Sequence, residues 1–257
     1  MSTSGVWSAL SSQAQPHERL QHSPLALVAA QVHFEDVGDV SRQDARALQR
    51  LLGKESWPEI QGQQLLVGVI GPAGIGQQPP RLAWQISQPD RTKVISLNPD
   101  SVALESGSYA GWADYAQTLT KLIAAVEEVI SPDQVRRVGL RYVNQIALPE
   151  GHETWDGLIP NEVLGLAAKD SLVAQDIWAT EQRVALKVDD EIQCIFRHGL
   201  FTDTEGDRKY LLDYDIYREA SRGFGAAEIS RTTEALHERV WLLFRATVTE
   251  NLFKYFL

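Results

Sequence analysis

Two predicted strands carry charged and amide side chains that are able to do chemistry. One strand contains Arg141 and Asn144, and the other contains Asp213 and Asp215. Side chains alternate between the two faces of a strand, so Asp213 and Asp215 share a face. By the same rule Arg141 and Asn144 point to opposite faces. A buried charge needs a partner, because an unpaired one costs several kcal/mol. The four residues are therefore predicted to form a polar cluster.

The two aspartates of this cluster allow two interpretations. Two carboxylates on one face can hold a divalent cation, because hard cations prefer oxygen ligands. The structural alternative is a salt bridge from Asp213 to Arg141 or Arg197. The structural interpretation is favoured, since a metal nuclease usually also needs a Lys, a His or a third acid, and none is in register with Asp213 and Asp215. We therefore expect neither a metal site nor a cofactor.

The other reactive residue types show no catalytic pattern. The six histidines lack a His-x-x-x-His spacing, and no Gly-x-Ser-x-Gly segment is present. His237 lies on the closing helix and is predicted to be a hydrogen-bonded interface histidine. Cys194 is the only cysteine, so it forms no intrachain disulfide and is predicted to be buried as an apolar residue. The glycine-rich residues 71–76 lack the Lys-Ser/Thr ending of a phosphate loop and are predicted to join two strands. The sequence does not favour an enzyme.

Seven tryptophans are many for one chain, and such side chains often lie at ligand or protein contacts. Trp155 sits in the polar segment 153–157 and is the best candidate for a surface contact. Trp178 interrupts the residues 172–180, which are otherwise typical of a strand.

The elements that position these residues follow from hydrophobic periodicity. A stripe through Trp112, Tyr115, Leu119, Leu122 and Val126 predicts a long helix, and a second long helix begins near Glu228. Each is preceded by a strand, a short helix and several antiparallel strands. The pattern predicts an α+β fold of two similar halves, each an antiparallel sheet packed on one long amphipathic helix. The expected divisions are a flexible tail at 1–22, a first half at 23–132 and a second half at 133–257.

Composition restricts the class of partner. The chain has 257 residues and a formal net charge of −10, which argues against binding nucleic acid through a broadly basic surface. No segment approaches the ~18 uninterrupted apolar residues of a membrane span, and the N-terminal residues lack the pattern of a signal peptide. We expect a cytoplasmic protein that does not bind a membrane.

Three motifs carry a family resemblance: Gly-Leu-Arg-Tyr-Val-Asn at 139–144, Leu-Asp-Tyr-Asp at 212–215 and the closing amphipathic helix with Leu-His at 236–237. From about Pro24 onward the chain resembles a sporadically distributed family of uncharacterised prokaryotic proteins of similar length. It departs at Gln145, where the family often has Arg, and at the Ala-Ala-Gln of residues 29–31, where a Glu-Ala pair is common. The resemblance implies no activity, substrate or cofactor. The patchy distribution suggests mobile or defence-associated genes.

The leading hypothesis is a non-catalytic binding or regulatory protein, an antitoxin-like or defence-associated component. It would hold a protein partner or a small ligand between its two halves. The alternative is a metal-dependent hydrolase or nuclease that uses Asp213 and Asp215. A third hypothesis, a subunit of a nucleoprotein assembly, requires a basic groove that a linear sequence does not show.

Overall fold

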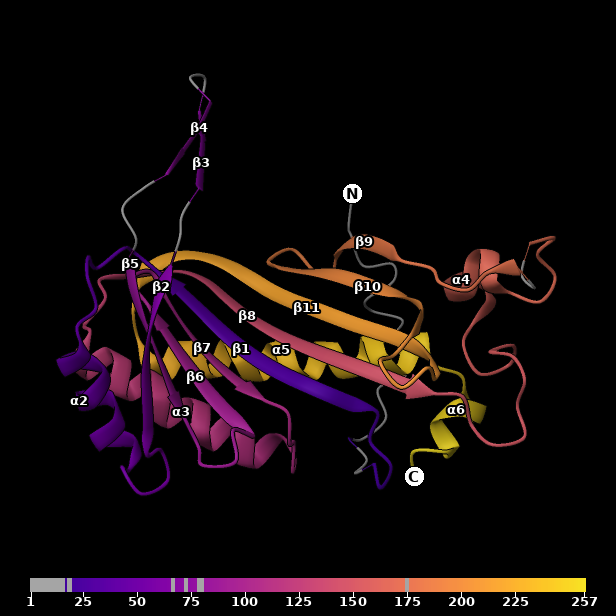
Figure 1. The fold of residues 1–257 in the computed structure, drawn as a ribbon, viewed down its shortest axis with the longest axis horizontal. Coiled ribbons are helices and arrows are strands. Elements are labelled where there is room, and N and C mark those ends of the chain that lie inside the picture. The colour runs from indigo at the N-terminus through magenta and orange to yellow at the C-terminus, as the bar shows by residue number, and fades with distance from the viewer. Residues whose placement is uncertain (1–16, 18–19, 66–67, 72–73, 78–80, 174–175) are drawn as a thin grey trace. The chain divides into compact units, whose positions relative to one another are not determined.

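The computed structural model describes residues 17, 20–65, 68–71, 74–77, 81–173 and 176–257 (Figure 1). In chain order the elements are β1 (Leu25–Phe34), α2 (Arg42–Leu52), β2 (Glu59–Leu65), β3 (Gly68–Gly71), β4 (Gly74–Gln77), β5 (Arg81–Ser87), β6 (Lys93–Asn98), β7 (Ser101–Ser106), α3 (Trp112–Val129), β8 (Gln134–Ala147), α4 (Asn161–Leu164), the 3₁₀ turn η1 (Gly165–Ala167), β9 (Gln182–Lys187), β10 (Ile192–Thr202), β11 (Arg208–Gly223), α5 (Ala226–Thr247) and α6 (Glu250–Lys254).

Nine of the strands form a single sheet in the order β2-β5-β6-β7-β1-β8-β11-β10-β9 (Figure 1). The strands β3 and β4 pair with each other as a separate antiparallel hairpin. The expected loop at 71–76 lies partly outside the described residues, and its described part differs from the expectation. Gly71 ends β3 and pairs with Gly74, and residues 74–76 belong to the strand β4. Along the chain, this hairpin comes between β2 and β5.

The expectation of two half-sheets, each packed on its own long helix, is wrong. The strands β1 and β8 lie next to each other inside the nine-stranded sheet. Backbone bonds join them at both ends, from Gln145 N to Pro24 O at 2.9 Å and from Glu35 N to Gln134 O at 3.0 Å. Pairing these strands satisfies two edges that separate half-sheets would leave open, and open edges carry unpaired backbone groups. Side-chain periodicity shows which face of a strand is buried but does not show which strand lies beside it.

The chain divides into two compact units. The first comprises Met1–Val28, Leu140–Arg218 and Glu234–Leu257, and the second comprises Ala29–Gly139 and Glu219–Thr233. The three strands β1, β8 and β11 and the helix α5 each contribute residues to both units. The polar cluster predicted from the sequence lies in the first unit.

In the first unit, one face of the sheet is buried beneath the C-terminal part of α5. Along β11 the residues Tyr210, Leu212, Tyr214 and Ile216 are buried, and their neighbours on the opposite face are more exposed except for Asp213. The Tyr214 hydroxyl lies within hydrogen-bond distance of Thr247 Oγ1 on α5. The opposite face of the same strands is the more exposed one, and it carries the charged side chains.

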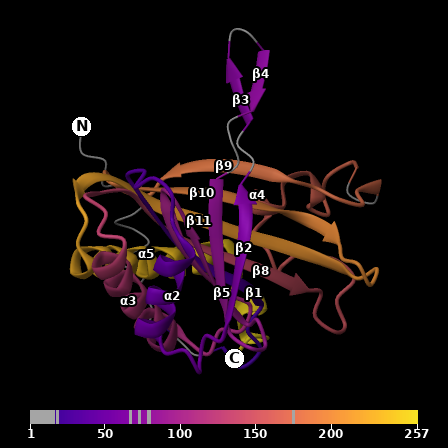
Figure 2. The ribbon, with the colours of Figure 1, turned by 60° about the vertical axis from the view of Figure 1, so that its left-hand side comes forward.

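In the second unit, α2 and α3 lie side by side (Figure 2). The helix α2 begins with a capping box in which the Ser41 side chain accepts from the Asp44 amide and the Asp44 carboxylate accepts from the Ser41 amide. The predicted stripe of α3 is confirmed, because Tyr115, Leu119, Leu122 and Val126 are all buried. The Tyr115 hydroxyl donates to Leu104 O on β7 at 2.7 Å, so α3 is held against the sheet by a buried bond.

Three further observations concern the N-terminal residues, the described helices and the cysteine. Most of the expected tail at 1–22 lies outside the described residues, although within it the His22 amide donates to Phe256 O at 3.1 Å. Among the described helices, none combines the length with the apolar composition that a membrane span needs. Cys194 is buried as predicted, and burial raises the pKa of its thiol to about 12.

Candidate functional site

Asp213 is the centre of the polar cluster, and two arginines from neighbouring strands share its carboxylate. Arg141 on β8 donates from Nε to Oδ1 and from Nη2 to Oδ2, both at 2.8 Å. Arg197 on β10 donates from Nη1 to Oδ2 at 3.3 Å. The side chain of Asp213 is only 3% exposed, whereas that of Arg141 is 46% exposed. The structure therefore satisfies a nearly buried carboxylate through two guanidinium groups that reach the surface.

The register of the strands explains why these three side chains meet. The strands β10 and β11 are antiparallel, and their register places Arg197 directly opposite Asp213. Across β11, the neighbouring strand β8 supplies Arg141. The sequence left the partner of Asp213 open between Arg141 and Arg197, and the structure uses both.

The other two predicted members take different positions. Asp215 lies on the same face as Asp213, opposite Ile195 of β10. Asn144 is buried on the other face, where its Nδ2 donates to Leu212 O at 3.2 Å. The Asn144 side chain thus links β8 to the backbone of β11 on the buried face, and it is not part of the charged cluster around Asp213.

A cation at Asp213 would compete with the two arginines. Both oxygens of its carboxylate already accept charge-assisted hydrogen bonds. A divalent ion in contact with that carboxylate would also lie close to two fixed positive charges, and this arrangement is electrostatically unfavourable. The geometry is therefore that of a structural ion-pair cluster.

The buried face beneath Arg141 contains a histidine that is held neutral. His237 on α5 lies 2.9 Å from the Tyr142 hydroxyl through its Nδ1, and its ring lies 4.8 Å from that of His17. Burial lowers the pKa of His237 to about 3, and the neighbouring His17 contributes to the same shift. Burial also lowers the pKa of His17. The predicted hydrogen bond of His237 at a helix-sheet interface is confirmed.

Trp155, the expected surface aromatic, is buried. Its side chain is 7% exposed, and its ring lies 5.5 Å from that of Tyr210 on β11. The chain turns after Trp155, and the backbone amides of Leu158 and Ile159 both donate to Trp155 O at 3.0 Å. Trp155 therefore anchors its loop to the sheet and does not present its ring to a partner.

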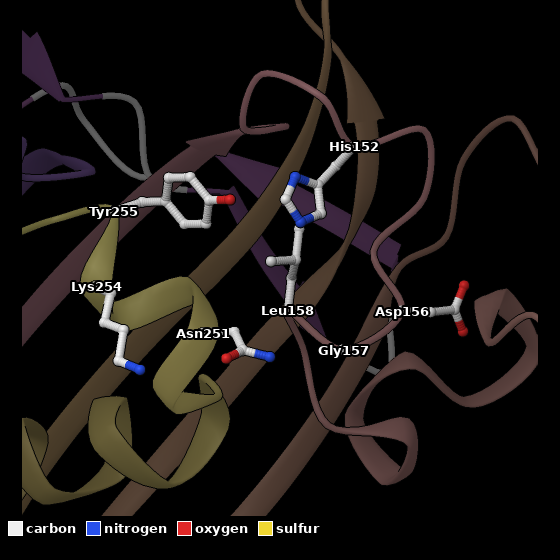
Figure 3. Close-up of a pocket in the computed structure, with 7 residues that line it drawn as sticks. All are labelled: His152, Asp156, Gly157, Leu158, Asn251, Lys254 and Tyr255. Atoms are coloured by element: carbon white, nitrogen blue, oxygen red, sulfur yellow. The ribbon is translucent and has the colours of Figure 1, made fainter.

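A pocket of about 320 Å³ lies beside this loop, where α6 faces residues 152–158 (Figure 3). Its lining includes His152 and Asp156 from the loop and Lys254 and Tyr255 at the end of α6. The Asp156 carboxylate points away from the other labelled side chains and accepts a bond from the Lys169 amide at 2.8 Å. The pocket therefore does not bring its carboxylate beside its histidine, as acid-base chemistry would require.

An acidic turn between β10 and β11 also has a structural explanation. The carboxylates of Asp203, Glu205 and Asp207 lie within 4.8 Å of one another. Asp203 accepts hydrogen bonds from the Glu205 and Asp207 amides and pairs with Lys209 at 2.6 Å. These bonds are typical of an Asp-stabilised turn.

The exposed apolar side chains are concentrated in a different region, the segment 166–184. Among the described residues, half of the exposed large hydrophobic side chains fall in this short segment; they are Leu166, Leu172, Val173, Trp178 and Val184. The Trp178 side chain is 79% exposed. The predicted strand at 172–180 is wrong, because the described residues of this stretch form turns and irregular backbone, with pairing resumed only at Thr180.

Sequence reasoning missed this exposed segment. The sequence predicts a strand at residues 172–180, although Trp178 interrupts the alternation and the polar residues 169–171 precede it. That interruption was the only signal available. Apolar residues predict burial in most positions, so exposure of this kind is visible only in the tertiary structure.

No protein-family model matches the chain, and no curated protein matches it. Function is therefore inferred from the geometry of the described residues.

Proposed function

We propose that the chain is a non-catalytic protein-binding module and that its contact surface is formed by the exposed apolar side chains of residues 166–173 and 176–184. The concentration of exposed large hydrophobic residues in this segment carries the proposal. Large exposed apolar patches are typical of interaction sites, and tryptophan is enriched among the residues that contribute most to binding. Trp178 is the expected anchor of the interface.

The charged residues support binding over catalysis. The Asp213 carboxylate, the main candidate for metal or acid chemistry, already accepts hydrogen bonds from Arg141 and Arg197. The pocket beside α6 does not pair Asp156 with His152. A cytoplasmic location is part of the proposal. The net charge of −10 favours a protein partner over nucleic acid.

The proposal is tested by comparing two surface variants of the full chain. Trp178→Ala removes the expected anchor, and Leu51→Ser is the matched control, since Leu51 is an exposed hydrophobic residue outside the segment. Affinity purification from the native host, with quantitative mass spectrometry, measures what each variant retains. A protein recovered in stoichiometric amount with the wild type and with Leu51→Ser should fall by about tenfold or more with Trp178→Ala.

Two results would contradict the proposal. If no protein is recovered stoichiometrically with the wild type, the chain does not act as a stable binding module. If Trp178→Ala retains the partner as well as Leu51→Ser does, the segment 166–184 is not the contact surface.

A further inference from the structure

We infer that β9 is a docking edge for an extended acidic segment of the protein partner, which adds to the sheet as a further strand. The inference rests on the proposed function and specifies how the partner binds. Among the described strands, β9 is at the end of the nine-stranded sheet, next to β10. It begins at Gln182, shortly after Trp178, and it includes Val184 of the exposed apolar segment.

The hydrogen bonds of β9 show which backbone groups point outward. The Thr180 amide bonds to Leu200 O and the Val188 amide bonds to Ile192 O, both in the register that pairs β9 with β10. Successive residues of a strand direct their backbone groups to opposite sides, so the even-numbered residues bond to β10. The amides and carbonyls of Arg183, Ala185 and Lys187 therefore point away from the sheet. Such a row is a template for another strand.

The side chains along this edge favour an acidic occupant. Arg183 and Lys187 are both exposed and share one face of β9. The register places Arg183 beside Arg197, which lies opposite Asp213. Arg197 and Arg141 already pair with the Asp213 carboxylate, whereas, among the described residues, no bond to Asp213 is seen for the outermost guanidinium of this row, that of Arg183. The Lys187 ammonium pairs with Asp190 at 3.1 Å, but both side chains are largely exposed, so that pair is weak.

The required pattern in the partner follows from strand geometry. Partner residues that lie beside Arg183 and Lys187 are four positions apart on one face and are expected to be Asp or Glu; the residue midway between them on that face lies beside Ala185. The residues that alternate with these lie on the other face, beside Val184, whose side chain is 39% exposed. These positions are expected to be apolar. The predicted ligand is thus a short extended segment in which acidic and apolar residues alternate.

A second copy of this chain fits the edge less well. Antiparallel pairing of two β9 strands about Ala185 would place Arg183 of each copy opposite Lys187 of the other. Like charges directly opposite each other destabilise a strand pair. Charge complementarity therefore favours a different, acidic partner.

Two synthetic peptides of equal length provide the first test. One alternates Glu with Val, and the other has Lys in place of Glu; both carry fluorescein. Fluorescence anisotropy with the full chain should show that the acidic peptide binds at least about tenfold more tightly than the basic one and more weakly at high salt. The double variant Arg183→Glu, Lys187→Glu should reverse this preference. Equal affinity for both peptides, or no binding of either, would overturn the inference.

The backbone contribution is tested on both sides of the edge. Ala185→Pro removes an outward amide and leaves the bonds to β10 intact, a position where edge strands accept proline. This variant should bind the acidic peptide at least about tenfold more weakly. If it does not fold, an acidic peptide that is N-methylated at alternate residues makes the same comparison with the wild-type chain. Two such peptides are needed, one methylated at the odd positions and one at the even positions. If both bind as tightly as the unmethylated peptide, no strand is added.

Amide hydrogen exchange separates this inference from the proposed function. The acidic peptide should slow hydrogen exchange at the amides of Arg183, Ala185 and Lys187. The amides of their even-numbered neighbours bond to β10 and should exchange slowly with or without the peptide. If these outward amides already exchange slowly in the absence of peptide, another segment of the chain or a second copy occupies the edge. That result would overturn the inference. If a partner depends on Trp178 but leaves these three amides unchanged, the proposed function stands and strand addition fails.

Discussion

The Asp213 cluster and the β9 edge lie on the same sheet face of the first unit but differ in how their charges are used. Around Asp213, two arginines surround a buried carboxylate and satisfy both of its oxygens. Along β9, Arg183 and Lys187 are exposed, and the backbone beside them points outward. The charged residues that the sequence marks most clearly, Arg141 and Asp213, therefore stabilise the sheet, whereas the β9 edge is the surface that we propose for recognition.

The largest expected effect comes from removing one partner of Asp213. Arg141→Ala leaves the buried carboxylate with a single hydrogen bond of 3.3 Å from Arg197. We expect the free energy of unfolding to fall by about 3–4 kcal/mol, at the lower end for a broken buried pair because the Arg141 side chain is half exposed. Denaturant unfolding measures the change.

The matched control for this variant is Arg183→Ala on the same sheet face. It removes an exposed guanidinium and should change the free energy of unfolding by less than about 0.5 kcal/mol. If Arg141→Ala and Arg183→Ala lower the free energy of unfolding equally, the Asp213 cluster is no more important for stability than the exposed charges of β9, and the comparison fails.

The next largest effect concerns the attachment of β9 to the sheet. At Gly199 on β10, φ is +153°, and an added Cβ would lie 2.0 Å from Thr180 O. Gly199→Ala should therefore push the chain away just before β9 and lower the free energy of unfolding by about 2–3 kcal/mol. Thermal unfolding measures the loss of stability, and the anisotropy assay measures separately whether β9 still binds the acidic peptide.

Gly139→Ala on β8 is the control for that variant. The nearest atom to its added Cβ is the end of the flexible Arg137 side chain at 3.4 Å. It should cost less than about 1 kcal/mol. A larger loss for Gly139→Ala than for Gly199→Ala would contradict the close approach between Thr180 and Gly199.

A smaller effect is expected from pH, through the histidine beneath Arg141. The pKa of His237 is lowered from 6.5 to about 3, so below pH 6.5 the unfolded chain binds a proton that the folded chain does not. The contribution of neutral His237 to the free energy of unfolding is therefore fully present above pH 6.5 and is lost as the pH falls below 6.5. Between pH 7 and pH 5 the loss attributable to His237 is about 2 kcal/mol. Unfolding at both values should show a weaker pH dependence in His237→Gln; an unchanged dependence would contradict this assignment.

The smallest effect is expected in the exposed segment. Leu172 is fully exposed, so Leu172→Ser should change the free energy of unfolding by less than about 0.5 kcal/mol. Calorimetry provides the measurement. A loss above about 1 kcal/mol would mean that Leu172 is buried in solution, and the contact surface would then have to be sought elsewhere.

The sequence by itself determined the local features. Alternation along β11 placed Asp213 and Asp215 on one face and the buried residues on the other, and the helical stripe through Tyr115 and Leu122 located α3. Both patterns follow from the geometry of one element, which depends only on residues close in sequence. The burial of Cys194 was predicted for the same reason.

The tertiary structure alone decided which elements are neighbours. Pairing of β1 with β8 made one sheet where two were expected, and the register of β10 against β11 set Arg197 opposite Asp213. It also buried Trp155, the best candidate for a surface contact, and exposed Trp178. These outcomes depend on contacts between distant segments, and a hydrophobic pattern along one strand does not encode the identity of the strand beside it.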